Sequence, residues 1–221
     1  MYFPQKVTKI KASDRVLEIG PGTSPHARSD VLLEKYFADE TEHIRQCGGT
    51  PVARNDPRTV YYEGDEFPFS DGEFDYVICS HVIEHVDNVE KFFSEMFRVS
   101  NAGYLEYPLI YYEYVFDIPE HLNVFMKHEG VLVYARKTEL FSPSLRPAQQ
   151  LWYSALSAGY TDTVSELAPY VMQGFEWEAP FEVRHTEMVS ELFHSDFFIP
   201  HRPPRVSISK RLVKRLVRLI R

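Results

Sequence analysis

Short apolar runs separated by polar segments fill the first half of the chain. The runs rich in β-branched and aromatic residues predict strands, and they lie at 15–19, 31–37, 59–62, 74–79 and 103–107. Between the last two runs, apolar residues recur at helical spacing from Val89 to Val99, with Asp87 or Asn88 as the expected N-cap. Strands that alternate with crossover segments are typical of a parallel sheet in an α/β domain.

The second half of the chain is less regular. Its expected elements are strand pairs at 123–126 with 131–136 and at 175–178 with 181–184, and a helix over 145–159. Pro200, Pro203 and Pro204 then indicate the end of the compact body. We therefore expect one α/β domain over residues 1–201 and a separate tail over 202–221.

A glycine turn follows the first predicted strand directly, in the segment Glu18-Ile19-Gly20-Pro21-Gly22. Glycine lets a ligand approach the backbone where a side chain would block it, and such turns lie at the ligand-binding edge of open α/β sheets. The third glycine of a dinucleotide fingerprint is absent, because Thr23-Ser24-Pro25 follows. This argues against NAD or FAD as the ligand.

Polar residues also follow the next predicted strands. Glu34 lies within the second run, where a carboxylate could accept hydrogen bonds from ribose hydroxyls. The segment 64–69, Gly-Asp-Glu-Phe-Pro-Phe, offers carboxylates for an amino group and an apolar wall for a ring. The fourth run continues into a polar segment that begins with Ser80 and His81.

In this order and spacing, 16–22, 64–69 and 74–86 resemble the class I S-adenosylmethionine-dependent methyltransferases, in particular the type 11 group. The resemblance covers residues 14–108 and is weak beyond, where 109–201 would bind the acceptor and complete the sheet. It implies a Rossmann-like, doubly wound, mostly parallel seven-stranded sheet with S-adenosylmethionine across the strand ends. It also implies the cofactor-binding residues, which are Glu18, Gly20, Pro21 and Gly22 near the methionine part, Glu34 at the ribose, Asp65, Glu66 and Phe67 near the adenine, and Ser80 with His81 closing the site.

The first crossover departs from this pattern. Only eight residues separate Gly22 from Val31, which allows about two helical turns at ~3.6 residues each. A helix N-terminus supplies free N–H groups and a favourable dipole to a bound carboxylate. We therefore expect a shortened first crossover, in which a truncated helix gives the methionine end of the site less than its usual support.

Candidate chemistry gathers at two places. His81, Glu84 and His85 superficially suggest metal ligands, but no third ligand of matching spacing is nearby, so we favour a structural or cofactor-bordering role and expect no metal. His81 and His121 are the candidate catalytic residues. His121 follows Pro119-Glu120 as a hypothetical general base, and a surface histidine is the alternative. The nearby aromatic cluster, which could wall an acceptor pocket or cover the sheet edge, consists of Tyr111, Tyr112, Tyr114 and Phe116.

Charge divides the chain into two parts. The 221 residues contain 24 Lys and Arg against 32 Asp and Glu, a net charge of −8. Residues 202–221 hold eight of the basic residues and no acidic one, so 1–201 carries 16 basic and 32 acidic groups. An acidic body repels nucleic acid, so we expect no nucleic-acid partner.

The tail has a pattern of its own. Over 209–221, apolar residues occupy one helical face and basic residues the other, which predicts a C-terminal amphipathic helix. Residues 205–221 could lie on an anionic membrane, or dock on the acidic body or on a second copy. The chain shows no signal-peptide pattern and no membrane-spanning run, and its two cysteines, Cys47 and Cys79, lack zinc-site spacing. We expect a cytoplasmic protein, with peripheral membrane contact as an alternative.

The leading hypothesis is therefore S-adenosylmethionine-dependent methyl transfer to a small-molecule, glycan or lipid-linked acceptor. Direct methyl transfer needs alignment of two reactants, and a base only where the acceptor loses a proton. A non-catalytic binding or assembly subunit of the same fold is the second hypothesis, motivated by the short first crossover. An enzyme acting on a nucleotide or nucleotide-sugar is a third, disfavoured by the missing glycine and phosphate-gripping lysine.

Overall fold

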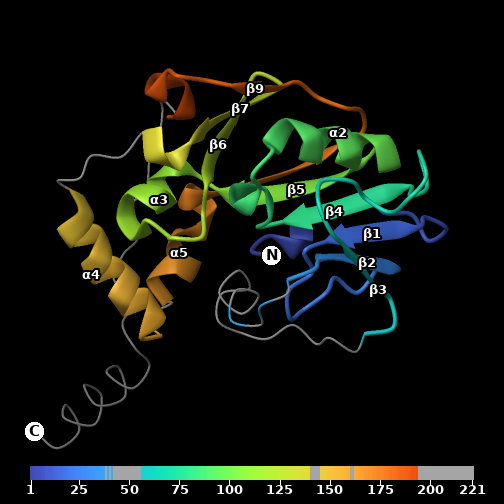
Figure 1. Ribbon diagram of the computed structural model, residues 1–221, viewed down its shortest axis with the longest axis horizontal. Helices are drawn as coiled ribbons and strands as arrows, with labels where there is room; N and C mark the ends of the chain where they lie inside the picture. Colours follow the sequence, from blue (N-terminus) through green and yellow to red (C-terminus); the bar gives the residue numbers. More distant parts are fainter. Residues whose placement is uncertain (38, 40, 42–55, 140–144, 160–161, 194–221) are drawn as a thin grey trace, which may run out of the picture.

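The main sheet of the computed structural model, which describes residues 1–37, 39, 41, 56–139, 145–159 and 162–193, has Rossmann-like topology (Figure 1). Its six strands, in spatial order, are β3 (Thr59–Tyr62), β2 (Val31–Lys35), β1 (Val16–Ile19), β4 (Tyr76–Ser80), β5 (Gly103–Pro108) and β8 (Met172–Trp177). The first five are mutually parallel, and β8 runs antiparallel to β5. The predicted Rossmann-like α/β fold is confirmed, but the expected seven strands are six in this sheet.

The central strands explain the apolar runs. Every residue of β1 and of β5 is buried, as parallel strands covered on both faces require. The helix α2 (Val89–Val99) covers one face with side chains spaced three and four apart, including the buried Phe92, Phe93 and Met96. Asn88 is its N-cap, because its side chain accepts a hydrogen bond from the Lys91 N–H at 3.1 Å.

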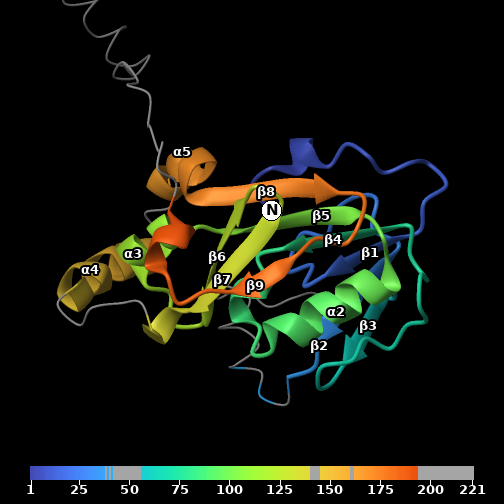
Figure 2. The ribbon, with the colours of Figure 1, turned by 90° about the horizontal axis from the view of Figure 1, so that it is seen from above.

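The N-terminal segment lies on the other side of the main sheet from α2 (Figure 2). It contains the short 3₁₀ helix η1 (Pro4–Lys6), and Val7 and Ile10 pack against buried Tyr76 and Tyr104. The face opposite α2 is thus covered by irregular chain, where the doubly wound expectation placed helices.

A second sheet adjoins the first and contains β6 (Asn123–His128), β7 (Val131–Arg136) and β9 (Val183–His185). The predicted pairing of β6 with β7 is confirmed, and it is antiparallel. The predicted pairing of 175–178 with 181–184 is wrong, because β8 pairs with β5 and β9 runs parallel to β7. Each segment instead pairs with a strand of an existing sheet, β8 with β5 and β9 with β7, and these pairings replace the predicted local hairpin.

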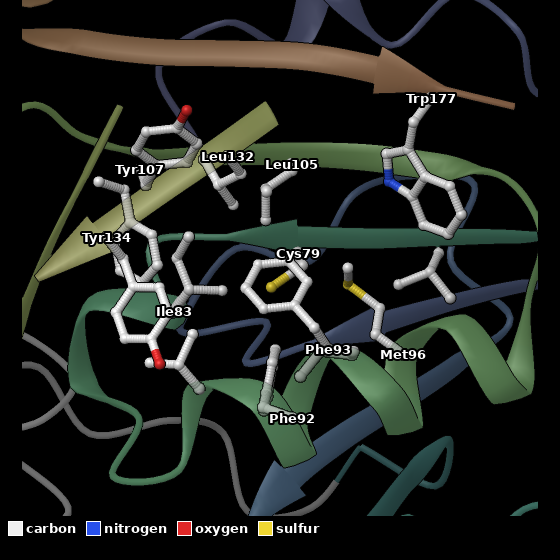
Figure 3. Close-up of a cluster of buried hydrophobic side chains, with 14 of the residues drawn as sticks. Cys79, Ile83, Phe92, Phe93, Met96, Leu105, Tyr107, Leu132, Tyr134 and Trp177 are labelled. Atoms are coloured by element: carbon white, nitrogen blue, oxygen red, sulfur yellow. The ribbon is translucent and has the colours of Figure 1, made fainter. Parts of the chain in front are cut away.

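One hydrophobic core joins the two sheets (Figure 3). Cys79 and Leu105 of the main sheet, Phe93 and Met96 of α2, and Leu132 of the second sheet are all buried in it. Cys79 is fully buried, so its predicted role as a small core residue agrees with its position.

The 3₁₀ turn η2 (Ile83–His85) lies between β4 and α2. The remaining described helices follow β5 along the chain, and they are α3 (Ile110–Phe116), α4 (Arg146–Ser157), α5 (Asp162–Val171), and the 3₁₀ turns η3 (Lys137–Glu139) and η5 (Val189–Leu192). The helix predicted over 145–159 is confirmed as α4, whereas α3 and α5 were not predicted. In the part of the chain that the structure describes, no helix is both long and apolar enough to cross a membrane. The basic tail lies outside the described residues.

Candidate active site

A cavity of about 1250 Å³ opens at the carboxyl ends of the parallel strands. This is the edge at which open α/β sheets bind ligands. Single small-molecule sites usually measure about 300–1,000 Å³, so this cavity has room for two ligands. Its lining includes most of the predicted site residues, namely Gly20, Pro21, Gly22, Glu34, Asp65, Phe67, Ser80, His81 and His121.

The glycine turn after β1 forms one wall. Gly20 and Gly22 both adopt left-handed conformations, with φ of 61° and 58°, which favour glycine. A Cβ atom on Gly20 would lie 2.4 Å from Val82 Cγ2, whereas one on Gly22 would meet nothing within 4 Å. Gly20 is therefore required for packing, and Gly22 leaves open backbone beside the cavity.

The segment between β1 and β2 is short, as predicted, but it contains turns and no helix where a truncated helix was expected. Glu18 was expected to border the cofactor, but it does not line the cavity. Its buried carboxylate accepts hydrogen bonds from the His26 N–H at 2.8 Å and the Ser29 hydroxyl at 2.6 Å. Burial raises the Glu18 pKa, and these hydrogen bonds oppose the rise. Glu18 thus holds the short connection in place of the missing helix.

Glu34, near the end of β2, is buried with its side chain on the cavity. One carboxyl oxygen, Oε2, is shielded from solvent and has no hydrogen-bond partner. Burial raises the pKa of Glu34 to about 7, because desolvation disfavours the charged form. A buried acceptor without a donor is costly and is suited to a ligand hydroxyl.

The residues after β3 differ in whether they line the cavity. Asp65 and Phe67 line the cavity, and the Phe67 ring packs edge-to-face on Tyr62 with centroids 5.3 Å apart. Glu66 does not line it, and its side chain is 82% exposed at 3.4 Å from Lys91 Nζ. The prediction that Glu66 flanks a bound ring is therefore not supported by its position.

His81 is held between two carboxylates at the end of β4. Its Nδ1 lies 3.2 Å from Glu84 Oε1 and its Nε2 lies 3.0 Å from Glu106 Oε1. Burial alone would lower the His81 pKa, but the hydrogen bond to Glu106 and the nearby charges of Glu84 and Glu106 raise it to about 9. At neutral pH His81 is a cation with both nitrogens engaged, which does not suit the catalytic proton-accepting role considered for it.

His121 lies in the chain between α3 and β6, and its ring packs edge-to-face on that of His85 with centroids 4.7 Å apart. It is 9% exposed, so the alternative of a surface histidine is wrong. Its Nδ1 contacts the carboxylate of Glu113, a fully buried residue of α3, and Lys137 Nζ is 3.4 Å from the other Glu113 oxygen. A carboxylate at Nδ1 fixes the imidazole tautomer and leaves Nε2 free to act.

Sequence reasoning missed Glu113, Lys137 and Tyr2. Glu113 and Lys137 are buried polar residues on elements that the sequence did not connect. Tyr2 lines the cavity, and its ring packs edge-to-face on His81 with centroids 5.2 Å apart. The acidic position inside the aromatic run 110–116 was the one available signal for Glu113.

The residues of the aromatic cluster on α3 lie in two different environments, the cavity wall and the packing around Phe193. Tyr112 is buried and lines the cavity. Tyr111 and Tyr114 pack on Phe193, with ring centroids 5.4 and 5.8 Å apart. Tyr112 therefore walls the cavity, while Tyr111 and Tyr114 contribute to packing.

Comparison with known proteins supports the resemblance. Residues 17–105 match the family model described as methyltransferase domain. A sterol 24-C-methyltransferase of Schizosaccharomyces pombe is 32% identical over 101 residues, which are 42% of this chain and 27% of that protein. Ajmaline N-methyltransferase of Rauvolfia serpentina is 37% identical over 100 residues, covering 42% and 34%. The chain thus spans about a third of the length of these relatives.

Among solved structures, an S-adenosylmethionine-dependent methyltransferase of Mesorhizobium loti is similar over 61% of this chain and 62% of its own, at 14% identity and a TM-score of 0.35. So low a score adds no weight to the strand order described above. The family resemblance predicted from the motifs is confirmed by the domain match over residues 17–105.

Proposed function

We propose that this chain, whose residues 17–105 match the methyltransferase domain, binds S-adenosylmethionine and transfers its methyl group to a small acceptor. The observation that carries the proposal is the unpartnered Oε2 of buried Glu34, on a cavity at the carboxyl ends of the parallel strands. When bound, the cofactor supplies an electrophilic methyl group.

The residues present fit this cofactor. Glu34 offers a buried acceptor for ribose hydroxyls, and Phe67 with Tyr62 offers an aromatic wall. The open space beside Gly22 admits a ligand close to the backbone. Because no helix follows this turn, loop N–H groups would hold the methionine end, without the usual helix dipole.

The acceptor would enter from the side of Tyr112 and His121. Both lie in the second half of the chain, outside the matched domain, and both line the cavity. A buried, pre-positioned wall of this kind orients one reactant against another, which supplies most of what methyl transfer needs.

The acceptor class follows from charge and from the relatives. The acidic composition of residues 1–201 disfavours nucleic acid. Two similar proteins are named for a sterol and for ajmaline, which are small molecules. A small-molecule, glycan or lipid-linked acceptor therefore remains our proposal.

Calorimetric titration of the purified full chain with S-adenosylhomocysteine tests cofactor binding. We expect micromolar affinity that falls at least tenfold in Glu34→Gln, because the variant loses the charged acceptor. Glu66→Gln is the matched control, since Glu66 belongs to the same predicted set but is exposed. Absence of binding by folded wild-type protein, or an equal loss in both variants, would overturn the proposal.

The missing helix after the glycine turn favours a second candidate, a non-catalytic binding subunit of the same fold. Incubation with S-adenosylmethionine and pooled small-molecule acceptors separates the two. Formation of S-adenosylhomocysteine, reduced about tenfold in Glu34→Gln at cofactor concentrations below the wild-type Kd, supports the enzyme. Tight cofactor binding with no product from any pool favours the binding subunit.

A further inference from the structure

Glu84, His85 and His121 form a cluster on the cavity wall, in which the proposed function leaves Glu84 and His85 without a role. The turn η2 carries Glu84 and His85, while His121 comes from the chain before β6. One potential ligand atom from each residue lies within 4.8 Å of the other two. The third ligand that the local sequence lacked is thus supplied by a residue more than 30 positions away.

Glu84 is a fully buried carboxylate. Neither of its oxygens has a hydrogen-bond partner. The 3.2 Å approach of Oε1 to His81 Nδ1 is an ion pair whose alignment falls short of a hydrogen bond. The ion pair with His81 offsets part of the cost of burying this carboxylate, and Oε2 remains a buried acceptor without a partner that a directly bound metal ion would satisfy.

Both histidines are held in the tautomer that a metal needs. His85 Nδ1 lies 3.0 Å from the Glu120 carbonyl oxygen, which only accepts, so Nδ1 carries the hydrogen and Nε2 has the free lone pair. His121 Nδ1 is engaged by the Glu113 carboxylate in the same manner. Metal-binding histidines usually have such a partner on the second nitrogen.

We propose that Glu84, His85 and His121 bind a divalent transition-metal ion, with Zn²⁺ as the best match. Two imidazoles and a carboxylate on one side of an ion are a common set that leaves further positions open. Bonds of about 2.1 Å require side-chain shifts of roughly 1 Å from the present spacing. The open positions face the cavity, because all three ligands line it.

The role of the ion rests on the proposed methyl transfer. A hydroxyl oxygen of the acceptor would fill an open position, where the positive charge would lower its pKa so that its proton passes to water before the oxygen takes the methyl group and S-adenosylhomocysteine leaves. His121 would then be a ligand, and the proton-accepting role predicted for it would no longer be needed. The cavity would hold the cofactor between Gly22 and Glu34 and the acceptor at the ion.

Titration of untagged, chelator-treated full chain with Zn²⁺ in a calorimeter tests the site. We expect one ion per chain, with affinity reduced at least 100-fold in Glu84→Gln and in His121→Ala. Glu113→Gln should weaken binding about 10- to 100-fold, since Glu113 orients His121. Glu129→Gln and His128→Ala are matched controls, with side chains 85% and 67% exposed, and should bind as wild type.

Cobalt absorption provides a test that needs no variant. Co²⁺ added to the wild-type chain should give visible bands that Zn²⁺ removes at one equivalent. A featureless spectrum, or stoichiometric Zn²⁺ binding that persists in folded Glu84→Gln and His121→Ala, would overturn the proposal. S-adenosylhomocysteine affinity measured on the same samples separates the two proposals, because cofactor binding without Zn²⁺ binding contradicts the metal site alone.

Discussion

At the scale of single residues, Glu34 shows how a binding group can oppose stability. Its carboxyl is buried with one oxygen unpartnered, and its pKa is raised to about 7. The unfolded chain has an ordinary carboxyl pKa of 4.5, so it ionises first as pH rises. Folding stability therefore falls between pH 4.5 and 7 and stays lower above that range. The proposed binding role gives a reason for a carboxylate at a position where packing would favour a neutral group.

Glu34→Gln should reveal this cost. At pH 4 both side chains are neutral, so the variant and wild type should unfold with similar free energies. At pH 8 the variant should gain roughly 3 kcal/mol relative to wild type, the equivalent of the raised pKa. Urea unfolding at both pH values measures the difference. A relative stability that does not change with pH would show that Glu34 is not desolvated as described.

At the scale of elements, the strand β8 fastens the N-terminal segment to the sheet. Glu176 accepts hydrogen bonds from the Thr8 N–H at 2.8 Å, the Lys9 N–H at 2.9 Å and the Tyr76 hydroxyl at 2.6 Å. These contacts connect the irregular covering of the sheet to β4 and β8. The segment 175–178 does not form a hairpin with 181–184, because β8 pairs with β5 at the edge of the main sheet.

Glu176→Ala should therefore destabilise the protein by roughly 1–3 kcal/mol, because several hydrogen bonds are lost at once. Glu178→Ala is the control two residues along the chain. Its carboxylate pairs with Lys9 while 71% exposed, and such surface pairs contribute about 0–1 kcal/mol. Thermal unfolding followed by circular dichroism compares them. Equal effects would contradict the role given to Glu176.

At the scale of the whole molecule, one core and one cavity join the two halves of the chain. The buried cluster includes Leu17 and Val77 of the main sheet together with Val124 and Leu132 of the second sheet. The cavity likewise combines Gly20 and Glu34 with Tyr112 and His121. The matched domain and the segment beyond it should therefore unfold together.

We expect a single heat-induced transition, seen alike by circular dichroism and by the fluorescence of buried Trp177 and exposed Trp152. S-adenosylhomocysteine at about 100 times its Kd should stabilise the fold by about 2.7 kcal/mol. For a chain of this size that raises Tm by roughly 5–10 °C. Two separate transitions, with the ligand shifting only one, would show that the halves are independent.

The local pattern of apolar residues was sufficient to predict the elements that are buried on both faces. The apolar runs of β1, β4 and β5 and the three- and four-residue spacing in α2 depend on burial alone, and their order implied the parallel sheet. The glycine turn and its neighbours were also visible, because backbone freedom at Gly20 and Gly22 is a property of residue type. The sequence by itself therefore determined the fold class, the edge of the sheet at which the cavity opens and the shortness of the first crossover.

Only the tertiary structure decided what each polar group does. Glu18 and Glu66 have the right positions in the motif, but one holds a loop and the other faces solvent. His121 meets Glu84, His85 and Glu113 because chain folding brings distant segments to one cavity, and spacing along the chain does not record such distances. Tertiary packing also determined which strands pair at the sheet edges, β8 with β5 and β9 with β7. Residue type and periodicity encode burial, whereas charge state and ligand geometry depend on which groups are neighbours in space.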